Sequence, residues 1–366
     1  MSSRPPEVGA GAGAWPTPRP DLGLQEGYHS AQVPVAVRLN TNESPYPPPR
    51  EWLEALMAEA SDMSFNRYPD RSARALRLAL GELHGVPMES VFAANGSNEV
   101  LQCLCLGYGG PGRRALMFEP TYALHAHIAH LTGTEVVRVR RDEGFRLGPR
   151  EAAEAVRRES PSIVFLCSPN NPTGLSESRA TVQAVLDAAE GALVVVDEAY
   201  GQFAPWSALE VLSDALPLVV VRTYSKTWAM AGLRLGYMVG PPAVVQVMER
   251  VALPYHLDSL KQAAGRLALR FSSQMEEHVA AIVAERERLV EALRGMPVEV
   301  WPSDANFLLW RPLAKPGAQV WQELVERSVL VRDMSTLPGM EGYLRTTVGA
   351  PGENGTFLAA LAQVLA

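Results

Sequence analysis

Short runs of apolar residues alternate with longer amphipathic segments between about residues 50 and 255. Three of these runs, rich in β-branched residues and bounded by polar or turn residues, span 163–166, 193–196 and 218–221. Such runs predict strands that are buried on both faces, as in a parallel sheet covered by helices. Upstream, leucines recur at helical spacing over residues 72–84, which predicts an amphipathic helix. Strands separated by helices in this way indicate an α/β fold.

The last third of the chain has a different pattern, in which helices and short strands follow one another without regular alternation. Charged positions along one side predict a long helix over 275–293, and an apolar run predicts a strand over 306–310. A helix over 319–327 and short strands at 329–331 and 344–346 are expected to follow. We expect these elements to form a smaller α+β domain.

The amino-terminal segment contains many residues that break regular structure. Residues 1–24 are rich in Pro, Gly and Ala and show no periodicity, which predicts a flexible arm. We expect residues 25–49, with a short strand at 35–39, to join the small domain. The large domain is then expected to span 50–257, and the small domain 258–366.

The composition is that of a globular protein. The chain has 366 residues, 47% of them hydrophobic and 20% charged, and a formal net charge of −7 at pH 7. It contains no apolar run of roughly 18 residues and no signal-peptide pattern, so we expect neither a transmembrane helix nor secretion. Its basic residues are scattered, which argues against nucleic acid as a partner. Three cysteines cannot form an even set of disulfides, which favours a reducing cytoplasm.

Lysine is rare in this chain, and the three lysines are Lys226, Lys261 and Lys315. A reaction that needs an amine to bond with an aldehyde therefore has three candidates, since the guanidinium of arginine keeps its proton. Lys226 follows the strand predicted over 218–221, and ligands of open α/β sheets bind beyond such strand ends. Lys261 is expected on a helix and Lys315 in a loop before a proline, so neither has this setting.

Hydroxyl and guanidinium groups surround Lys226 in the sequence. Thr223 and Ser225 precede it, and Arg234 follows eight residues later. These groups suit the phosphate of a phosphorylated aldehyde, while the amine of Lys226 bonds to its carbonyl carbon.

A second polar cluster follows the strand predicted over 193–196. Asp197 could pair with a protonated pyridine nitrogen and keep the ring an electron sink, and Tyr200 could donate a hydrogen bond to a phenolic oxygen. An acidic pair after a strand also occurs in nucleotide hydrolases, but the required GxxxxGK(S/T) loop is missing from the sequence upstream. The nucleotide-hydrolase interpretation is therefore excluded.

Three weaker signals lie at other element ends. Asn171, in the turn over 168–174, offers a side-chain donor beyond a third strand. Ser97 and Asn98 precede an apolar helix and could hold phosphate at its N-terminus, although either could be a simple helix cap. Tyr122 could stack on a flat cofactor or serve only in packing.

Three histidines lie close together in the sequence, at His125, His127 and His130. No carboxylate or cysteine accompanies them at ligand spacing, so we expect no metal site.

Eight short motifs occur in order along the chain. They are LNTNE (39–43), RYPD (67–70), GSNE (96–99), PTY (120–122), SPNNPTG (168–174), DEAY (197–200), SK (225–226) and AGLRLGY (231–237). As an ordered set they resemble the fold-type I aminotransferases that depend on pyridoxal 5′-phosphate (PLP), and specifically the histidinol-phosphate aminotransferase family. The match runs from about residue 28 to the C-terminus and includes VRD (331–333) and LRTTVG (344–349).

The resemblance implies the PLP-dependent transferase fold of type I, with a mainly parallel mixed sheet flanked by helices and a smaller α+β domain. It implies PLP as the cofactor and Lys226, Asp197 and Tyr200 as catalytic residues. The implied cofactor contacts are Lys226 at the aldehyde carbon, Asp197 at the ring nitrogen, Asn171 and Tyr200 at the phenolic oxygen, Tyr122 on the ring, and Ser97, Asn98, Thr223, Ser225 and Arg234 around the phosphate.

The resemblance also implies substrate and partner contacts. Tyr28, Asn42, Arg332 and Arg345 match positions that contact substrate. Tyr68 matches a cofactor-binding tyrosine that reaches the neighbouring subunit's site, which implies a homodimer. The implied reaction transfers the amino group of L-histidinol phosphate to 2-oxoglutarate, giving imidazole-acetol phosphate and L-glutamate in histidine biosynthesis.

Other functions remain open at this point. An aromatic or broad-specificity aminotransferase is the main alternative, and PLP-dependent decarboxylation of threonine phosphate is a more distant one. A non-catalytic PLP-binding regulator is the alternative outside enzymes, although we expect no helix-turn-helix extension, because the 24-residue arm is too short for one.

Overall fold

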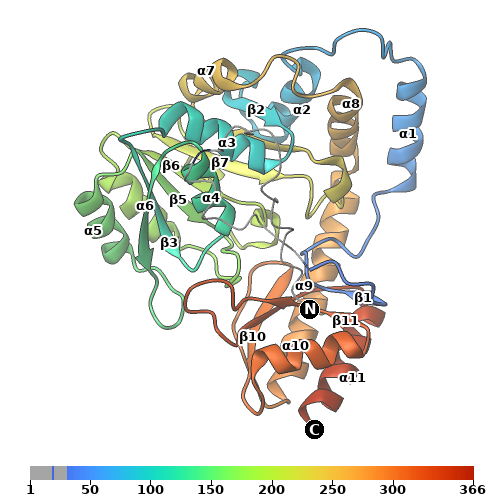
Figure 1. Ribbon diagram of the computed structural model, residues 1–366. Coiled ribbons are helices and arrows are strands. Elements are labelled where there is room, and N and C mark those ends of the chain that lie inside the picture. Colours follow the sequence, from blue (N-terminus) through green and yellow to red (C-terminus); the bar gives the residue numbers. More distant parts are fainter. Residues whose placement is uncertain (1–18, 20–30) are drawn as a thin grey trace, which may run out of the picture. The chain divides into compact units, whose positions relative to one another are not determined.

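The three apolar runs form the centre of a seven-stranded sheet in the computed structural model, which describes Arg19 and residues 31–366 (Figure 1). The strand order is β2-β8-β7-β6-β5-β3-β4. β8 pairs antiparallel with β2 and β7, and the other pairs are parallel. The strands are β2 (Val91–Ala94), β3 (Arg114–Glu119), β4 (Glu135–Arg140), β5 (Ile163–Cys167), β6 (Leu193–Asp197), β7 (Leu218–Thr223) and β8 (Gly236–Val239).

Helices cover both faces of this sheet, which explains why every residue of β5, β6 and β7 is buried. One face packs against α3, α4 and α7, and the other against α5 and α6 (Figure 1). The prediction of strands buried on both faces is confirmed. The helices are α3 (Ser97–Tyr108), α4 (Ala123–Leu131), α5 (Pro149–Glu159), α6 (Arg179–Ala188) and α7 (Pro242–Val251).

Three further helices pack beside β2 and β8, namely α1 (Arg50–Ser61), α2 (Arg74–His84) and α8 (Ser259–Ala268). The indole Nε1 of Trp52 on α1 donates a hydrogen bond of 3.0 Å to the carbonyl oxygen of Ala264 on α8. Apolar residues of α2 and α8 share one buried cluster with this tryptophan. α8 therefore packs with helices from the early part of the chain, and the predicted domain boundaries stay a prediction.

The carboxyl-terminal part contains a four-stranded antiparallel sheet, in the order β12-β13-β10-β9. The fully buried Phe307, Trp310 and Phe357 lie in its core. The predicted strand over 35–39 is shorter than expected, because only Val37–Arg38 (β1) pairs, in parallel with β11. The remaining elements are α9 (Ser272–Arg294), β9 (Val298–Val300), β10 (Phe307–Pro312), α10 (Gly317–Glu326), β11 (Val329–Leu330), β12 (Arg332–Asp333), β13 (Leu344–Thr347) and α11 (Pro351–Leu365).

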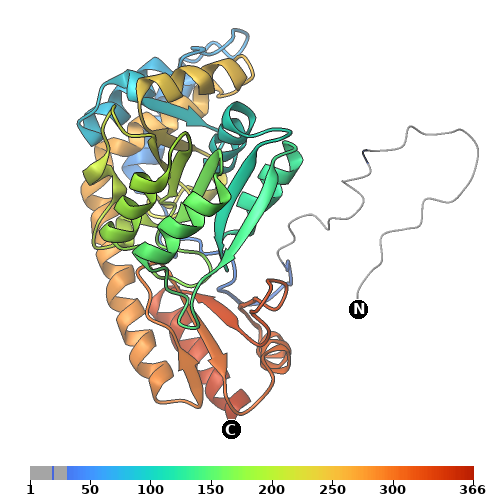
Figure 2. The same ribbon diagram turned by 90° about the vertical axis from the view of Figure 1, so that its left-hand side faces the viewer.

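The long helix α9 runs beside both sheets, as Figure 2 shows. In the described part of the chain, no helix has the length and apolar character needed to cross a bilayer. The predicted flexible arm over residues 1–24 lies, apart from Arg19, outside the described residues.

Candidate active site

The polar residues that follow the strands meet at one edge of the large sheet. Cys167 of β5 lies opposite Asp197 of β6, and β6 runs parallel to β7. Ala94 of β2 and Thr223 of β7 both pair with Gly236 of β8, so β2 and β7 end at the same edge. The segments that begin after these strands are therefore brought together, as ligand-binding loops of an α/β sheet are.

Lys226 directs its amine toward this edge. Its Nζ donates a hydrogen bond of 3.0 Å to the carbonyl oxygen of Thr41 and lies 5.8 Å from the ring centroid of Tyr200. Burial lowers the pKa of Lys226 to about 7, and the positive charge of Arg345 adds to this effect, while Glu43 opposes it. The amine can therefore be neutral near neutral pH, which a nucleophile or proton carrier requires.

Asp197 is held by His125, for which the sequence predicts no role at this site. Nε2 of His125 lies 2.9 Å from Oδ2 of Asp197 and donates to it, and the N–H of Ala199 donates to Oδ1 at 3.1 Å. The rings of His125 and Phe165 stack with centroids 4.8 Å apart. Both Asp197 and His125 are 1% exposed, so their contact is not screened by water. Contacts of this kind fix the orientation of a carboxylate.

Among the described residues, no group of three or more His, Cys, Asp and Glu side chains is placed to hold a metal ion. His125 instead serves Asp197, 72 positions away in the sequence. No sequence signal marks this contact, because it depends on how α4 packs against the sheet.

The small sheet contributes an arginine to the site. Arg345 of β13 is 5% exposed, and its Nη1 donates to Oδ1 of Asn171 while its Nη2 donates to the carbonyl oxygen of Asn40 at 3.0 Å. Nδ2 of Asn42 donates to the hydroxyl of Tyr200 at 2.9 Å. Residues from the amino-terminal segment, the large sheet and the small sheet thus meet at one place.

Two further observations concern these residues. Burial raises the pKa of the Tyr200 hydroxyl above its usual range, so the hydroxyl stays protonated and can donate a hydrogen bond. The Asn171–Pro172 peptide bond is cis.

Hydroxyl groups, a guanidinium and a helix N-terminus form a second part of the site. Oγ1 of Thr223 lies 3.1 Å from Oγ of Ser225, which accepts a hydrogen bond of 3.2 Å from Nη1 of Arg234. Gly96 has φ of 85° and directly precedes Ser97, the first residue of α3. A Cβ atom on Gly96 would lie 3.1 Å from Nη2 of Arg234, so glycine keeps this space open. Such a cradle fits a phosphate group.

Tyr122 links the two parts. Its hydroxyl donates to Oδ1 of Asn98 at 3.3 Å, and its ring meets that of His125 edge-on, with centroids 5.4 Å apart. It directly precedes α4, close to the His125–Asp197 pair. Its position suits the predicted stacking on a flat cofactor.

Of the other predicted contact residues, Arg332 lies beside Arg345, whereas Tyr68 lies on the surface. Arg332 of β12 is the cross-strand neighbour of Arg345, so both arginines project from adjacent strands. Tyr68 is 81% exposed and stacks on Tyr255 with ring centroids 4.5 Å apart, outside the cluster around Lys226. Tyr28 lies outside the described residues.

The sequence and the fold both match known proteins. Residues 34–363 match the model of the family described as aminotransferase class I and II. A histidinol-phosphate aminotransferase from Thermobifida fusca (strain YX) is 46% identical over 350 residues, which are 94% of this chain and 94% of that protein. One from Mycolicibacterium vanbaalenii is 44% identical over 359 residues, which are 94% of this chain and 95% of the relative.

A solved structure gives the comparison of folds. The crystal structure of histidinol-phosphate aminotransferase from Sinorhizobium meliloti in complex with pyridoxal-5′-phosphate has a TM-score of 0.85 at 23% identity. The match covers 96% of this chain and 98% of that one, and it shows a shared fold. The predicted fold class is confirmed. Together with the sequence matches, this shows that the chain belongs to the class I and II aminotransferases and, among them, to the histidinol-phosphate aminotransferases.

Proposed function

We propose that this protein transfers the amino group of L-histidinol phosphate to 2-oxoglutarate, with PLP as its cofactor, as a step of histidine biosynthesis. The substrate is supported by relatives of that name at 44% and 46% identity over nearly the whole chain. The observation that carries the proposal is the convergence of Lys226, whose pKa is lowered to about 7, with the buried Arg345 at the edge where β6 ends in Asp197.

The residues of the site fit PLP. When bound, PLP supplies an aldehyde carbon for the substrate amine and a ring that accepts electrons. Thr223, Ser225, Arg234 and the N-terminus of α3 would hold its phosphate, in the cradle that Gly96 leaves open. Asp197 would bind the ring nitrogen, and Tyr200 and Asn171 the phenolic oxygen.

Lys226 would move the proton of the reaction. A neutral Nζ would accept a proton from the α-carbon of the amino donor, and the ammonium group so formed would give this proton up again later in the reaction. Burial and the charge of Arg345 keep the pKa of this amine near 7, so both protonation states are accessible at neutral pH. The hydrogen bond that Nζ donates to the carbonyl oxygen of Thr41 orients the amine, and it can form in either protonation state.

Arg345 and Arg332 would bind the anionic end of each substrate. Histidinol phosphate has a phosphate and no carboxylate, whereas 2-oxoglutarate has carboxylates, so one site must accept both anions. A planar guanidinium can donate two parallel hydrogen bonds to either group. The two arginines are cross-strand neighbours on β12 and β13, which supports a shared anion site.

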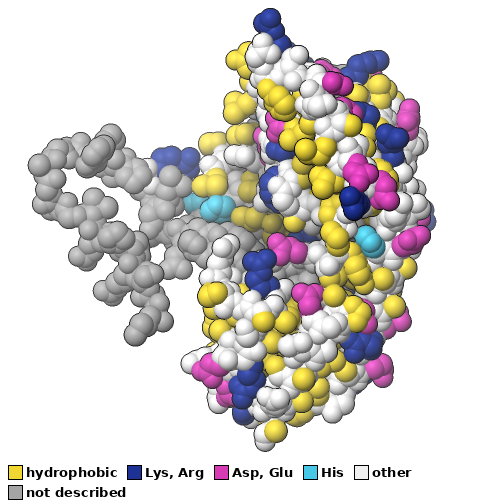
Figure 3. Space-filling model, turned by 90° about the vertical axis from the view of Figure 1, so that its right-hand side faces the viewer, with side chains coloured by type: hydrophobic (Ala, Val, Ile, Leu, Met, Phe, Trp, Pro, Cys, Tyr) yellow, Lys and Arg dark blue, Asp and Glu magenta, His cyan; other side chains and the backbone are white. Residues whose placement is uncertain are grey.

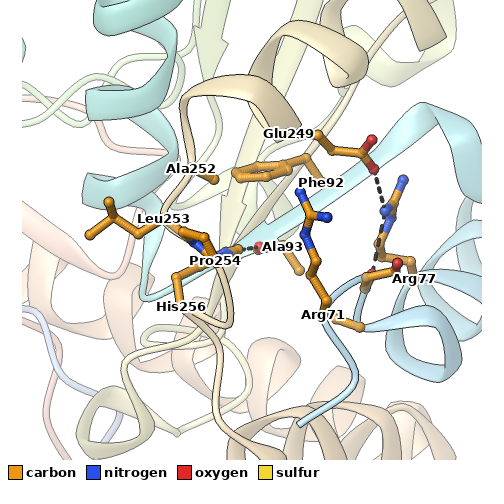
Figure 4. Close-up of a pocket in the computed structure, with 11 residues that line it drawn as sticks. Arg71, Arg77, Phe92, Ala93, Glu249, Ala252, Leu253, Pro254 and His256 are labelled. Atoms are coloured by element: carbon orange, nitrogen blue, oxygen red, sulfur yellow. Dashed lines mark hydrogen bonds and ion pairs between the residues drawn. The ribbon is translucent and has the colours of Figure 1, made fainter. Parts of the chain in front are cut away.

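We also propose that the active form is a homodimer in which Tyr68 enters the partner's site. Within one subunit, the ring of Tyr68 stacks on Tyr255 on one side but remains largely exposed to solvent. A pocket of about 220 Å³ lies between the segments that carry these tyrosines, with Arg71, Phe92 and His256 among its lining residues (Figure 4).

Other large apolar side chains among the described residues are also exposed to solvent. Leu53 and Met57 on α1, together with Phe65 and Leu253, are exposed. Figure 3 looks onto the side where α1 lies in Figure 1 and shows hydrophobic side chains between charged ones. Light scattering on the purified protein should give twice the mass of the chain, and a monomer with full activity would contradict this proposal.

We further propose that the protein is located in the cytoplasm, which its three free, buried cysteines support.

Steady-state kinetics test the proposed reaction. With 2-oxoglutarate as acceptor, kcat/KM for histidinol phosphate should exceed that for phenylalanine, and threonine phosphate should not be decarboxylated. Faster turnover of phenylalanine would identify a broad-specificity aminotransferase instead. PLP binding without transamination of any donor would favour the regulatory alternative.

A further inference from the structure

Lys261 makes a contact that the proposed mechanism does not use. It lies on α8, but its Nζ donates to Oδ1 of Asn95 and lies 3.4 Å from a carboxylate oxygen of Asp258. Its side chain is only 16% exposed. Solvated lysines usually extend into water, whereas this one is folded onto the loop that precedes α3.

Asn95 uses its whole side chain in this loop. Its Nδ2 donates to Oε2 of Glu99 and to the carbonyl oxygen of His256, both at 2.8 Å, while Oδ1 accepts from Lys261. Its backbone N–H also donates to Glu99. Because every polar atom of the amide has a partner, the orientation of Asn95 is fixed. Gly96, which lines the phosphate cradle, is the next residue.

We propose that Lys261 is a positioning residue for the cofactor phosphate, which it serves by fixing Asn95 and the loop at 95–97. The inference rests on the proposed function, because it requires PLP at the cradle. The N–H groups at the start of α3 bind an anion well only if the loop before them has one conformation. Without the lysine, the half-buried oxygen of Asn95 loses its donor, and the loop gains freedom that binding must remove.

If Lys261 acts on the phosphate site, its replacement should weaken the binding of PLP but not of pyridoxal. The affinity of the apoprotein for PLP and for pyridoxal, which lacks the phosphate, is measured by equilibrium dialysis for the wild type, Lys261→Met and Lys315→Met. We expect Lys261→Met to weaken PLP binding about tenfold, equal to roughly 1.4 kcal/mol, and to leave pyridoxal binding unchanged. Lys315 is a matched control, because its Nζ likewise contacts one carboxylate and one uncharged oxygen, which are those of Glu323 and of the Val364 carbonyl.

Two further variants make the result decisive. Lys261→Arg retains a donor and should restore most of the PLP affinity. Asn95→Ala should remove the effect of a second change at Lys261, because the two residues act through one contact. Unchanged PLP affinity in Lys261→Met, or an equal loss for PLP and pyridoxal, would overturn the proposal.

A different result would contradict the proposed function itself. If the wild-type protein bound no PLP, the function would be wrong whatever the Lys261 variants did. If the wild type binds PLP and transaminates histidinol phosphate while Lys261→Met binds PLP equally well, only the inference about Lys261 is wrong. Should Lys261→Met not fold, Lys261→Arg and Asn95→Ala are compared with the wild type by the same PLP-to-pyridoxal ratio.

Discussion

Replacing His125 by phenylalanine tests the buried His125–Asp197 pair, which would hold the ring nitrogen of the cofactor. The change keeps a flat ring stacked on Phe165, at the present centroid distance of 4.8 Å, but removes the donor that lies 2.9 Å from Asp197. Since both members of the pair are 1% exposed, water cannot replace the lost hydrogen bond. The N–H of Ala199 would remain as a donor to the other oxygen of Asp197.

The expected magnitude follows from this environment. Hydrogen bonds to charged groups contribute about 1.5–3 kcal/mol, so we expect His125→Phe to lose about 2 kcal/mol of unfolding free energy. If about 1.4 kcal/mol of that interaction serves to orient Asp197 in the transition state, kcat falls about tenfold. Urea unfolding of the apoprotein measures the first quantity, and steady-state kinetics with histidinol phosphate measure the second.

His125→Gln is the matched control, because its amide can place a donor near the position of the histidine Nε2. It should recover part of both losses. If His125→Phe matched the wild type in stability and kcat, the contact would have no importance and our interpretation of the pair would be wrong.

Three other predictions concern the rest of the site. Because burial lowers the pKa of Lys226 from 10.5 to about 7, the native apoprotein binds fewer protons than the unfolded chain between these values. The burial of Lys226 therefore lowers the free energy of unfolding most below pH 7, and this loss disappears as the pH rises toward 10.5. Lys226→Met should accordingly raise the Tm of the apoprotein most below pH 7. A gain in Tm confined to pH 10 would contradict this reasoning. Arg345→Gln should slow the half-reactions with both histidinol phosphate and 2-oxoglutarate in stopped-flow assays, more than Arg332→Gln does, whereas a defect limited to 2-oxoglutarate would exclude a shared anion site. Gly96→Ala should weaken PLP binding by about tenfold, because φ of 85° is strained for alanine and its Cβ would lie 3.1 Å from Arg234. Fluorescence titration with PLP measures this affinity, and an unchanged value would contradict the prediction.

The centre of the fold could be predicted from the sequence because all-apolar, β-branched strands suit only a sheet covered on both faces. The peripheral strands carry weaker signals. β4 (Glu135–Arg140) mixes charged and apolar residues at the sheet edge, and we predicted no strand there. The short β8 (Gly236–Val239) reverses direction between β2 and β7, and its antiparallel pairing depends on tertiary contacts that periodicity does not report.

The site could be predicted in part, for a similar physical reason. Residues directly after parallel strands, such as Asp197 and Lys226, must lie at one edge of the sheet, so their position in the sequence fixes their region in space. The partners of such residues come from helices packed on the sheet. His125 and Lys261 lie 72 and 166 positions from the residues they contact, and only the packing of α4 and α8 brings them there.

The identity of the amine that bonds to the cofactor is the most direct test of the proposed function. The purified protein is incubated with PLP, reduced with borohydride so that the bond becomes permanent, digested and analysed by mass spectrometry. The added mass should be found on the peptide that contains Lys226, and not on those with Lys261 or Lys315. A label on either of the other two lysines, or on none, would contradict the chemistry proposed for this site.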